Sequence, residues 1–214
     1  MQTSKSLILA RLKRSGGSPV DELATSLGLA RMTVRQHLAI LERDGLVTSR
    51  EVRRPTGRPH FVYSLTDLGE ETFPKRYDRL AELILEEVAR LDAKEMVGLT
   101  PAAKKKLLFD RMVERLSVQY QAKLSGKKLP ERVIAVAQIL DEEGGFAEWR
   151  ALKDGFEIAD YNCVYRRVVD SHGDLCDWHL SLLEKLLGGD VRCSQFMSKG
   201  AECCRFVVHE KASI

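Results

Sequence analysis

The sequence predicts an α+β fold because three stretches of different character follow one another along its 214 residues. The first stretch has three short segments of helical periodicity and then two strand-like runs; the second is almost wholly helical, and the third mixes both patterns. We therefore expect an N-terminal domain at residues 1–66, a central helical region at 67–128, and a small C-terminal α+β domain with antiparallel hairpins at 129–214.

Three amphipathic helices are expected near the N-terminus, each with apolar side chains at three- and four-residue spacing. They span residues 4–14, 19–27 and 31–43, and glycine follows each of them within two residues. Ser18 is expected to cap the second helix, with Pro19 in its first helical position.

Two strand-like runs follow these helices, at residues 46–52 and 60–65. The segment 53–59 between them is Arg-Arg-Pro-Thr-Gly-Arg-Pro, which predicts a hairpin with a basic tip. Three helices followed by such a hairpin are the arrangement of a winged helix-turn-helix domain, whose last helix enters the major groove of DNA.

The helix at 31–43 has the two faces that a DNA-reading helix needs. Val34, Leu38 and Leu41 form an apolar stripe for the domain core, and the opposite face offers polar donors that match base edges. The first turns of such a helix reach the bases, whereas a basic wing reaches phosphates or the minor groove. We expect base contacts from Arg31, Thr33, Arg35 and Gln36, and backbone contacts from His37, Arg50, Arg53, Arg54 and Arg58.

Charge is distributed unevenly along the chain. Residues 1–66 hold 11 Lys or Arg against 5 Asp or Glu, whereas the remainder holds 23 against 26. A basic first domain on a mildly acidic body suits a protein that binds double-stranded DNA. No apolar run approaches the roughly 18 residues of a membrane span, and the N-terminus lacks the apolar core of a secretory signal, so we expect a cytoplasmic protein without a membrane partner.

The central region predicts helices at 75–91 and 101–124, each with a regular apolar stripe. The helix at 75–91 either packs within its own subunit or pairs with its copy in a homodimer. We favour the homodimer, because it would present two DNA-binding domains to a palindromic operator.

The C-terminal domain contains all the cysteines of the chain. Clustered cysteines in a reducing compartment more often bind metal or act in redox chemistry than form disulfides, although buried thiols also serve as small apolar side chains. Cys203 and Cys204 are adjacent, so a strand would direct only one of them to a shared site. The expected elements are helices at 130–143, after Cys163 and at 174–187, and strands at 146–152, 156–161, 190–197 and 203–209.

Six motifs spread over nearly the whole chain carry a family resemblance. They are the basic segment 53–63, Phe-Pro-Lys-Arg-Tyr-Asp at 73–78, Glu-Arg-Val at 131–133, Tyr-Asn-Cys at 161–163, Leu-Cys-Asp-Trp-His at 175–179 and Glu-Cys-Cys-Arg-Phe-Val-Val at 202–208. In these motifs the chain resembles the SufR-type iron–sulfur regulators. The resemblance implies a dimeric repressor of iron–sulfur cluster assembly genes whose C-terminal domain holds an oxygen-sensitive cluster. We expect [4Fe–4S], and four thiolate-like ligands are also compatible with [2Fe–2S].

The resemblance also implies a set of cluster ligands. Cys163, Cys176 and Cys204 match three of the four family cysteines, the last of them if one residue is deleted in the closing hairpin. The remaining family position falls on Asp190. Cys193 is the preferred fourth ligand because it supplies a thiolate three residues later; the alternatives are Asp190, His179 and Cys203.

These patterns predict a transcriptional regulator, a repressor of iron–sulfur cluster assembly or related stress genes. An enzyme is not expected, because the sequence has no Gly-rich phosphate loop, nucleophile elbow or paired-carboxylate motif. The alternative keeps the DNA-binding domain and replaces the sensor: the cysteines are then structural, and the C-terminal domain responds to zinc or to a small organic effector, or holds no cofactor at all.

Overall fold

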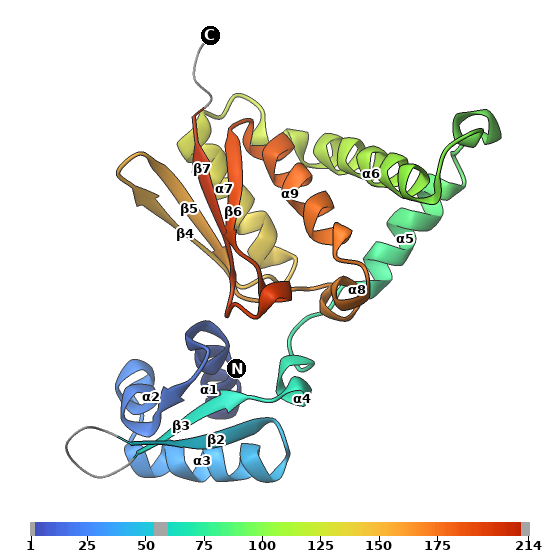
Figure 1. The fold of residues 1–214 in the computed structure, drawn as a ribbon. Helices are drawn as coiled ribbons and strands as arrows, with labels where there is room; N and C mark the ends of the chain where they lie inside the picture. Colours follow the sequence, from blue (N-terminus) through green and yellow to red (C-terminus); the bar gives the residue numbers. More distant parts are fainter. Residues whose placement is uncertain (1–2, 54–59, 211–214) are drawn as a thin grey trace. The chain divides into compact units, whose positions relative to one another are not determined.

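The computed structural model describes residues 3–53 and 60–210, which fall into two compact units at 1–74 and 75–214 (Figure 1). Both units combine helices with antiparallel strands, which confirms the predicted fold class. The division at residue 74 places the helices after it with the C-terminal strands. The domain boundaries expected at 66 and 128 stay predictions.

The N-terminal unit contains the predicted helices and hairpin. Its helices bury side chains such as Ile8, Leu23 and Leu38 against Val47 of the sheet, all of them at most 2% exposed. The sheet has the order β1-β3-β2. The elements are α1 (Ser4–Ser15), β1 (Ser18–Pro19), α2 (Val20–Leu27), α3 (Arg31–Arg43), β2 (Val47–Val52), β3 (His60–Leu65) and α4 (Asp67–Glu70).

The predicted cap of α2 is wrong. Ser18 and Pro19 form the short strand β1, where Ser18 pairs with Tyr63 of β3, and the helix begins only at Val20. Pro19 occupies the cap position and no side chain bonds to the first turn. Ser18 is 1% exposed and donates its hydroxyl to Ser15 Oγ at 3.0 Å. Pairing with a strand some 45 positions away therefore overrides the local capping signal.

The C-terminal unit is a four-stranded antiparallel sheet, in the order β4-β5-β7-β6, with helices on one face. Helices α7 and α9 contact each other and the sheet, and α6 packs outside them on α9 (Figure 1). The elements are α5 (Tyr77–Val88), α6 (Pro101–Leu124), α7 (Leu129–Glu142), β4 (Ala147–Leu152), β5 (Gly155–Asp160), α8 (Arg166–Ser171), α9 (Asp174–Leu187), β6 (Asp190–Gln195) and β7 (Cys204–His209), with 3₁₀ turns η1 (Ala93–Met96) and η2 (Met197–Lys199).

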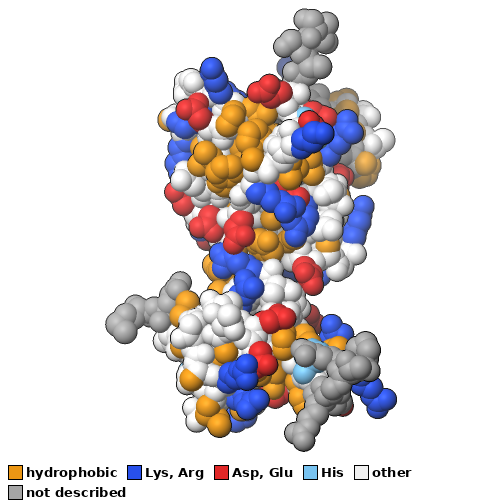
Figure 2. Space-filling view, turned by 90° about the vertical axis from the view of Figure 1, so that its left-hand side faces the viewer, with side chains coloured by type: hydrophobic (Ala, Val, Ile, Leu, Met, Phe, Trp, Pro, Cys, Tyr) orange, Lys and Arg blue, Asp and Glu red, His pale blue; other side chains and the backbone are white. Residues whose placement is uncertain are grey.

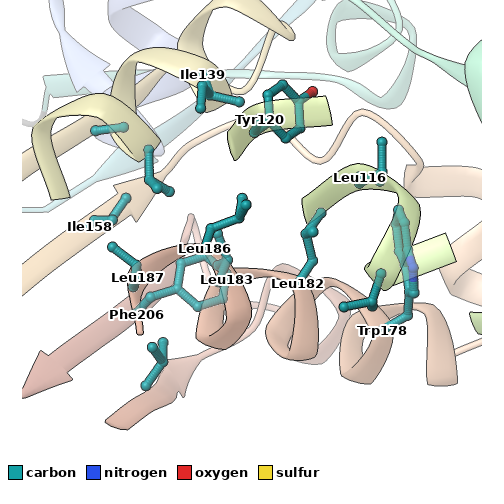
Figure 3. Packing of buried hydrophobic residues seen from close by; sticks show 14 of the residues in the cluster. Leu116, Tyr120, Ile139, Ile158, Trp178, Leu182, Leu183, Leu186, Leu187 and Phe206 are labelled. Atoms are coloured by element: carbon teal, nitrogen blue, oxygen red, sulfur yellow. The ribbon is translucent and has the colours of Figure 1, made fainter. Parts of the chain in front are cut away.

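One continuous apolar core joins these layers. Figure 3 shows side chains of α6, α7 and α9 pointing toward Ile158 of β5 and Phe206 of β7. Ile158 and Leu183 are fully buried, and Phe206 is 2% exposed. The sheet and its helices therefore form one packed unit, and the cysteines lie at one end of its sheet.

Helix α5 packs within its own subunit through one face. Leu80 and Leu83 join the core, and Glu87, 3% exposed, accepts hydrogen bonds from Arg111 and Arg115 of α6. Leu85 and Val88 lie on the other side of the helix and are 67% and 52% exposed. The helix is thus bound to its own subunit and still carries an apolar face in solvent.

Candidate nucleic-acid interface and cysteine site

Helix α3 has the exposed face that the sequence predicts. Val34, Leu38 and Leu41 are buried, while Arg31, Arg35 and Gln36 are exposed and Thr33 and His37 are partly buried. Met32, which the sequence analysis did not assign, is 62% exposed. It shares a helix face with Arg35 and Gln36, at three- and four-residue spacing, where an apolar side chain can contact a thymine methyl group.

The turn before α3 brings an acidic side chain near this face. Gly28 ends α2 with a φ of 64°, and the Arg31 Nε lies 3.0 Å from Asp21 Oδ1. Both side chains are more than 60% exposed, so the pair is weak and screened by salt. Arg31 can therefore exchange this partner for a base edge or a phosphate at little cost.

The predicted wing contacts are only partly within the described residues. Arg50 on β2 and Arg53 after it are exposed, whereas Arg54 and Arg58 lie outside the described residues. Glu42 of α3 accepts a hydrogen bond from Ser49 of β2 at 2.6 Å, which fixes the helix against the base of the wing. Burial raises the pKa of Tyr63, and the Glu42 carboxylate raises it further.

His37 is less available than a phosphate ligand would be. It is partly buried, and its Nδ1 is enclosed without a hydrogen-bond partner in the described part of the chain. Only the other ring nitrogen can then face a phosphate. The predicted roles of all these α3 and wing residues stay predictions.

Four cysteines from four different segments come together at one end of the C-terminal sheet. Cys163 follows β5, Cys176 lies in the first turn of α9, and Cys193 and Cys204 lie on β6 and β7. Three of them, Cys163, Cys176 and Cys204, line one cavity that encloses about 90 Å³. Cys193 pairs with Phe206 on the sheet face that the helices cover.

The cysteine thiols are close enough to interact electrostatically. The pKa of Cys163 is raised to about 11, mainly by burial and in smaller part by negative charges on Asp160 and Cys176. Burial likewise raises the pKa of Cys193 to about 11, again with a contribution from Cys176. The pKa of Cys204 is raised by burial and then by charges that include Cys193 and Cys163. Thiolates at this site are therefore disfavoured until a positive group neutralises them.

The thiols also have polar neighbours from the turn η2. The Met197 amide donates to Cys204 Sγ at 3.4 Å, and Ser198 Oγ lies 3.6 Å from Cys176 Sγ. Cys193 donates its thiol hydrogen to the Gln195 carbonyl at 2.9 Å. Amide and hydroxyl donors beside a sulfur stabilise it once it is charged.

The alternative ligands lie in different surroundings. Asp190 is at the far end of β6, opposite His209, and forms an ion pair with Arg192 at 3.1 Å. Three residues of extended strand, about 10 Å, separate it from Cys193. Cys203 is 2% exposed, and its neighbouring charges are Arg205, Glu157, Glu202 and Asp160 rather than the other thiols. The structure therefore does not bring either residue to the three cavity thiols.

His179 does line the cavity that contains the three thiols. Its ring meets Phe206 edge-on at a centroid distance of 5.7 Å, and Trp178 lies beside it. Burial lowers the pKa of His179 to about 4, so the imidazole is neutral at physiological pH. A neutral imidazole is the form that binds metal, and it is also the form that packs among aromatic rings.

The four thiols are donors of the kind that metal ions and iron–sulfur clusters use. In the residues that the structure describes, no group of three or more His, Cys, Asp or Glu is arranged to hold a metal ion. A [4Fe–4S] cluster binds each of four thiolates through a different iron atom, so its ligands lie farther apart than those of one ion. Four cysteines at one end of a sheet are the donor set that such a cluster uses.

The segment that carries Cys163 also binds the first residues after the N-terminal unit. Lys75 Nζ donates to Asn162 Oδ1 at 3.2 Å, and the Arg76 amide donates to the Val164 carbonyl at 3.0 Å. The Arg167 amide donates to Tyr77 Oη at 3.4 Å. These three contacts, which we name the linker clamp, gave no signal in the sequence because their partners are about 90 positions apart.

Comparisons with known proteins support the DNA-binding domain. Residues 1–48 match the family described as winged helix-turn-helix DNA-binding, and no curated protein matches the chain. The N-terminal unit is a winged helix-turn-helix domain, and its family match indicates that this domain binds DNA. In the described residues no helix is long and apolar enough to cross a membrane.

Solved structures give distant likenesses. One is Bordetella bronchiseptica BpsR, whose DNA binding is regulated by 6-hydroxynicotinic acid, with 17% identity, 55% of this chain and 80% of that chain covered, and a TM-score of 0.28. A MarR family regulator from Silicibacter pomeroyi has 23% identity, 56% and 71% coverage and a TM-score of 0.29. Bacillus subtilis PadR bound to operator DNA has 15% identity, 85% and 87% coverage and a TM-score of 0.29. Scores this low carry no argument about function.

Proposed function

We propose that this protein is a homodimeric transcriptional regulator whose affinity for DNA is set by an iron–sulfur cluster on Cys163, Cys176, Cys193 and Cys204. It would act in the cytoplasm on a palindromic operator and repress iron–sulfur cluster assembly or related stress genes. The observation that carries the proposal is the meeting of four thiols from four segments at one end of the C-terminal sheet.

Cys193 is the fourth ligand in this proposal. A negative charge on Cys176 contributes to the raised pKa of Cys193, whereas Asp190 lies farther along β6 and pairs with Arg192. Of the alternative ligands, His179 is the one that lines the same cavity. We assign it to packing beside the site, where its ring contacts Phe206.

The linker clamp provides a route from the thiols to the DNA-binding domain. When bound, the cluster supplies positive iron that neutralises four thiolates and ties their segments together. Asn162 and Val164 flank Cys163 and accept hydrogen bonds from Lys75 and Arg76. A change in the position of this segment would therefore move the residues that follow the N-terminal unit. A coupling free energy of about 1–3 kcal/mol between the two sites is enough to change DNA affinity roughly 5- to 150-fold.

The homodimer is proposed because winged domains of this kind read two half-sites. Leu85 and Val88 of α5 are exposed apolar side chains that the subunit does not cover. The exposed face of α5, the helix that the sequence indicates, is therefore one candidate surface for binding the second copy.

The test is iron and acid-labile sulfide analysis of protein purified without oxygen. We expect a coloured wild-type protein with iron and sulfide in equal amounts, loss of both in Cys193→Ser, and near-normal loading in Cys203→Ser and Asp190→Ala. The same samples, with and without bound cluster, would be titrated against duplexes selected from a random-sequence pool. Full loading in Cys193→Ser would contradict the ligand set, and colourless protein that contains zinc would contradict the cluster.

A second candidate is a winged-helix regulator that senses a small organic effector. The cavity beside the thiols favours it, since its walls are mainly apolar and include Arg79, Tyr120 and Glu143 as polar anchors. However, the cavity encloses about 90 Å³, and an engineered apolar cavity that binds benzene has about 150 Å³. An organic effector would therefore need the core to open, so we rank this function second.

A further inference from the structure

Strand β4 leaves one edge of the C-terminal sheet open. It ends the order β4-β5-β7-β6, and no other strand of the described residues pairs with its outer side. An edge strand presents N–H and C=O groups that another strand can bind, unless Pro, Lys or a bulge blocks it. β4 contains no Pro, Lys or bulge, and its two charged side chains, Glu148 and Arg150, have opposite signs. Its register with β5 is regular, whereas the opposite edge strand β6 has an irregularity between Cys193 and Gln195.

Large apolar side chains are exposed beside this edge. Trp149 is 43% exposed, and Ile134 on α7, the helix that contacts β4, is 36% exposed; Leu152, on the opposite face of the strand from Trp149, is 37% exposed. Figure 2 views the molecule from the side on which β4 lies in Figure 1 and shows hydrophobic side chains gathered on the C-terminal unit. Exposed large side chains next to an open edge are typical of a surface that pairs with another chain.

The sequence of β4 is complementary to itself when it is reversed. In an antiparallel pair centred on Trp149, this residue faces its own copy, Ala147 faces Ala151, and Glu148 faces Arg150. Two opposite-charge pairs and one aromatic pair then form across a two-fold axis. Cross-strand pairs of these kinds are the favourable ones in antiparallel sheets.

Neighbouring registers lose this complementarity. A pair centred on Glu148 places two carboxylates directly opposite each other, and a pair centred on Arg150 does the same with two guanidinium groups. Like charges in directly opposed positions destabilise a strand pair. Charge therefore favours the Trp149-centred register over the Arg150-centred one, which has the same number of facing pairs, and over the Glu148-centred one.

The backbone of β4 is in the right phase for this pairing. Leu152 pairs with Gly155 across a two-residue turn, so Leu152 directs its N–H and C=O toward β5. Alternation along the strand then directs the groups of Ala147, Trp149 and Ala151 to the open edge. These are the residues that face one another in the Trp149-centred register.

We propose that β4 pairs antiparallel with β4 of a second copy of this chain, centred on Trp149, and joins two four-stranded sheets into one of eight strands. The proposal rests on the proposed homodimer and names β4, instead of the exposed face of α5, as its surface. Arg150 now lies 2.9 Å from Glu157, which also binds Arg205 at 2.8 Å. Glu157 therefore keeps one guanidinium partner when Arg150 turns toward Glu148 of the second copy.

Two charge reversals test the register. Glu148→Arg gives a chain with two arginines at these positions, and Arg150→Glu gives a chain with two glutamates. Each variant alone turns both charge pairs of its homodimer into like-charge pairs, so we expect its dimer dissociation constant to rise about tenfold. An equal mixture of the two variants restores both opposite-charge pairs, and we expect a heterodimer as tight as the wild-type dimer.

The measurement is sedimentation equilibrium of the full-length chain, with differently tagged variants in the mixture. A folding defect from loss of the Arg150–Glu157 pair would weaken the mixture as well as the single variants, so recovery on mixing is specific to the register. A matched variant, Leu85→Ser with Val88→Ser on α5, should leave the dimer intact. If this α5 variant is monomeric while both charge reversals dimerise normally, the homodimer stands and the β4 interface is overturned; a monomeric wild-type chain overturns both.

Discussion

Arg35 of α3 and Arg43, about two helical turns further along the same helix, illustrate how position decides the role of an arginine. Both are exposed, but Arg35 lies in the first two turns, beside Gln36 and Met32, whereas Arg43 lies in the last turn and contacts Asp44 at 2.9 Å. The first turns of a recognition helix reach base edges, and its end reaches the backbone at most. The two residues should therefore differ in what their loss does to sequence preference.

We predict that Arg35→Ala weakens specific DNA binding by about 1–3 kcal/mol and relaxes preference at one base position. Arg43→Ala should weaken binding less, and equally for all sequences, since it removes at most a phosphate contact. Selection from a random duplex pool followed by fluorescence anisotropy measures both effects. An unchanged base preference in Arg35→Ala would remove it from the set of base-reading residues.

His179 makes the stability of the C-terminal unit depend on pH. Its pKa is lowered from 6.5 to about 4 by burial, so the folded state holds the neutral ring. The free energy of unfolding is not reduced by His179 above pH 6.5. It falls as the pH falls from 6.5 toward 4, because the unfolded chain binds a proton at this histidine before the folded chain does. The loss is on the order of 2–3 kcal/mol.

Urea denaturation of cluster-free protein between pH 7 and pH 4.5 measures this loss. In His179→Leu, which keeps an apolar side chain against Phe206, the dependence on pH over this range should become clearly shallower. An equally steep dependence in the variant would assign the effect to another group. The cluster-free protein is used so that ligand protonation does not contribute.

At the scale of elements, the sequence predicts best what is local. Helix α3 and helix α6 have the predicted bounds within the described residues, because three- and four-residue spacing and the glycine or proline at their ends are local signals. The capping role predicted for Ser18 is wrong because this residue pairs with Tyr63, which lies on a strand far away in the sequence. The meeting of the cysteines likewise depends on how β5, α9, β6 and β7 assemble, which spacing alone does not give.

The linker clamp is the element-scale feature with the clearest consequence. We predict that Lys75→Met, which removes the donor to Asn162, reduces the ratio of DNA affinities with and without cluster at least fivefold, while leaving cluster content and cluster-free DNA binding near wild type. Lys127→Met, on the exposed segment between α6 and α7, is the control for loss of a lysine charge. An unchanged affinity ratio in Lys75→Met would show that the signal passes elsewhere.

At the scale of the whole molecule, charge and symmetry act together. The basic residues of 1–66 outnumber the acidic ones by six, and the rest of the chain is mildly acidic. A dimer carries this arrangement twice, so each phosphate contact of one DNA-binding domain recurs in the other. The slope of log affinity against log salt therefore depends on how many DNA-binding domains are bound as well as on the number of phosphate contacts in each.

We predict that the slope of log affinity against log salt is about twice as steep for a duplex with two half-sites as for a duplex with one. If each domain neutralises about four or five phosphates, the slopes are roughly −8 and −4. In a dimer, Arg50→Ala removes one contact from each domain, so it should reduce the steeper slope by about two and the shallower one by about one. Equal slopes on the two duplexes, in a chain that sediments as a dimer, would mean that only one of its two winged domains binds DNA at a time.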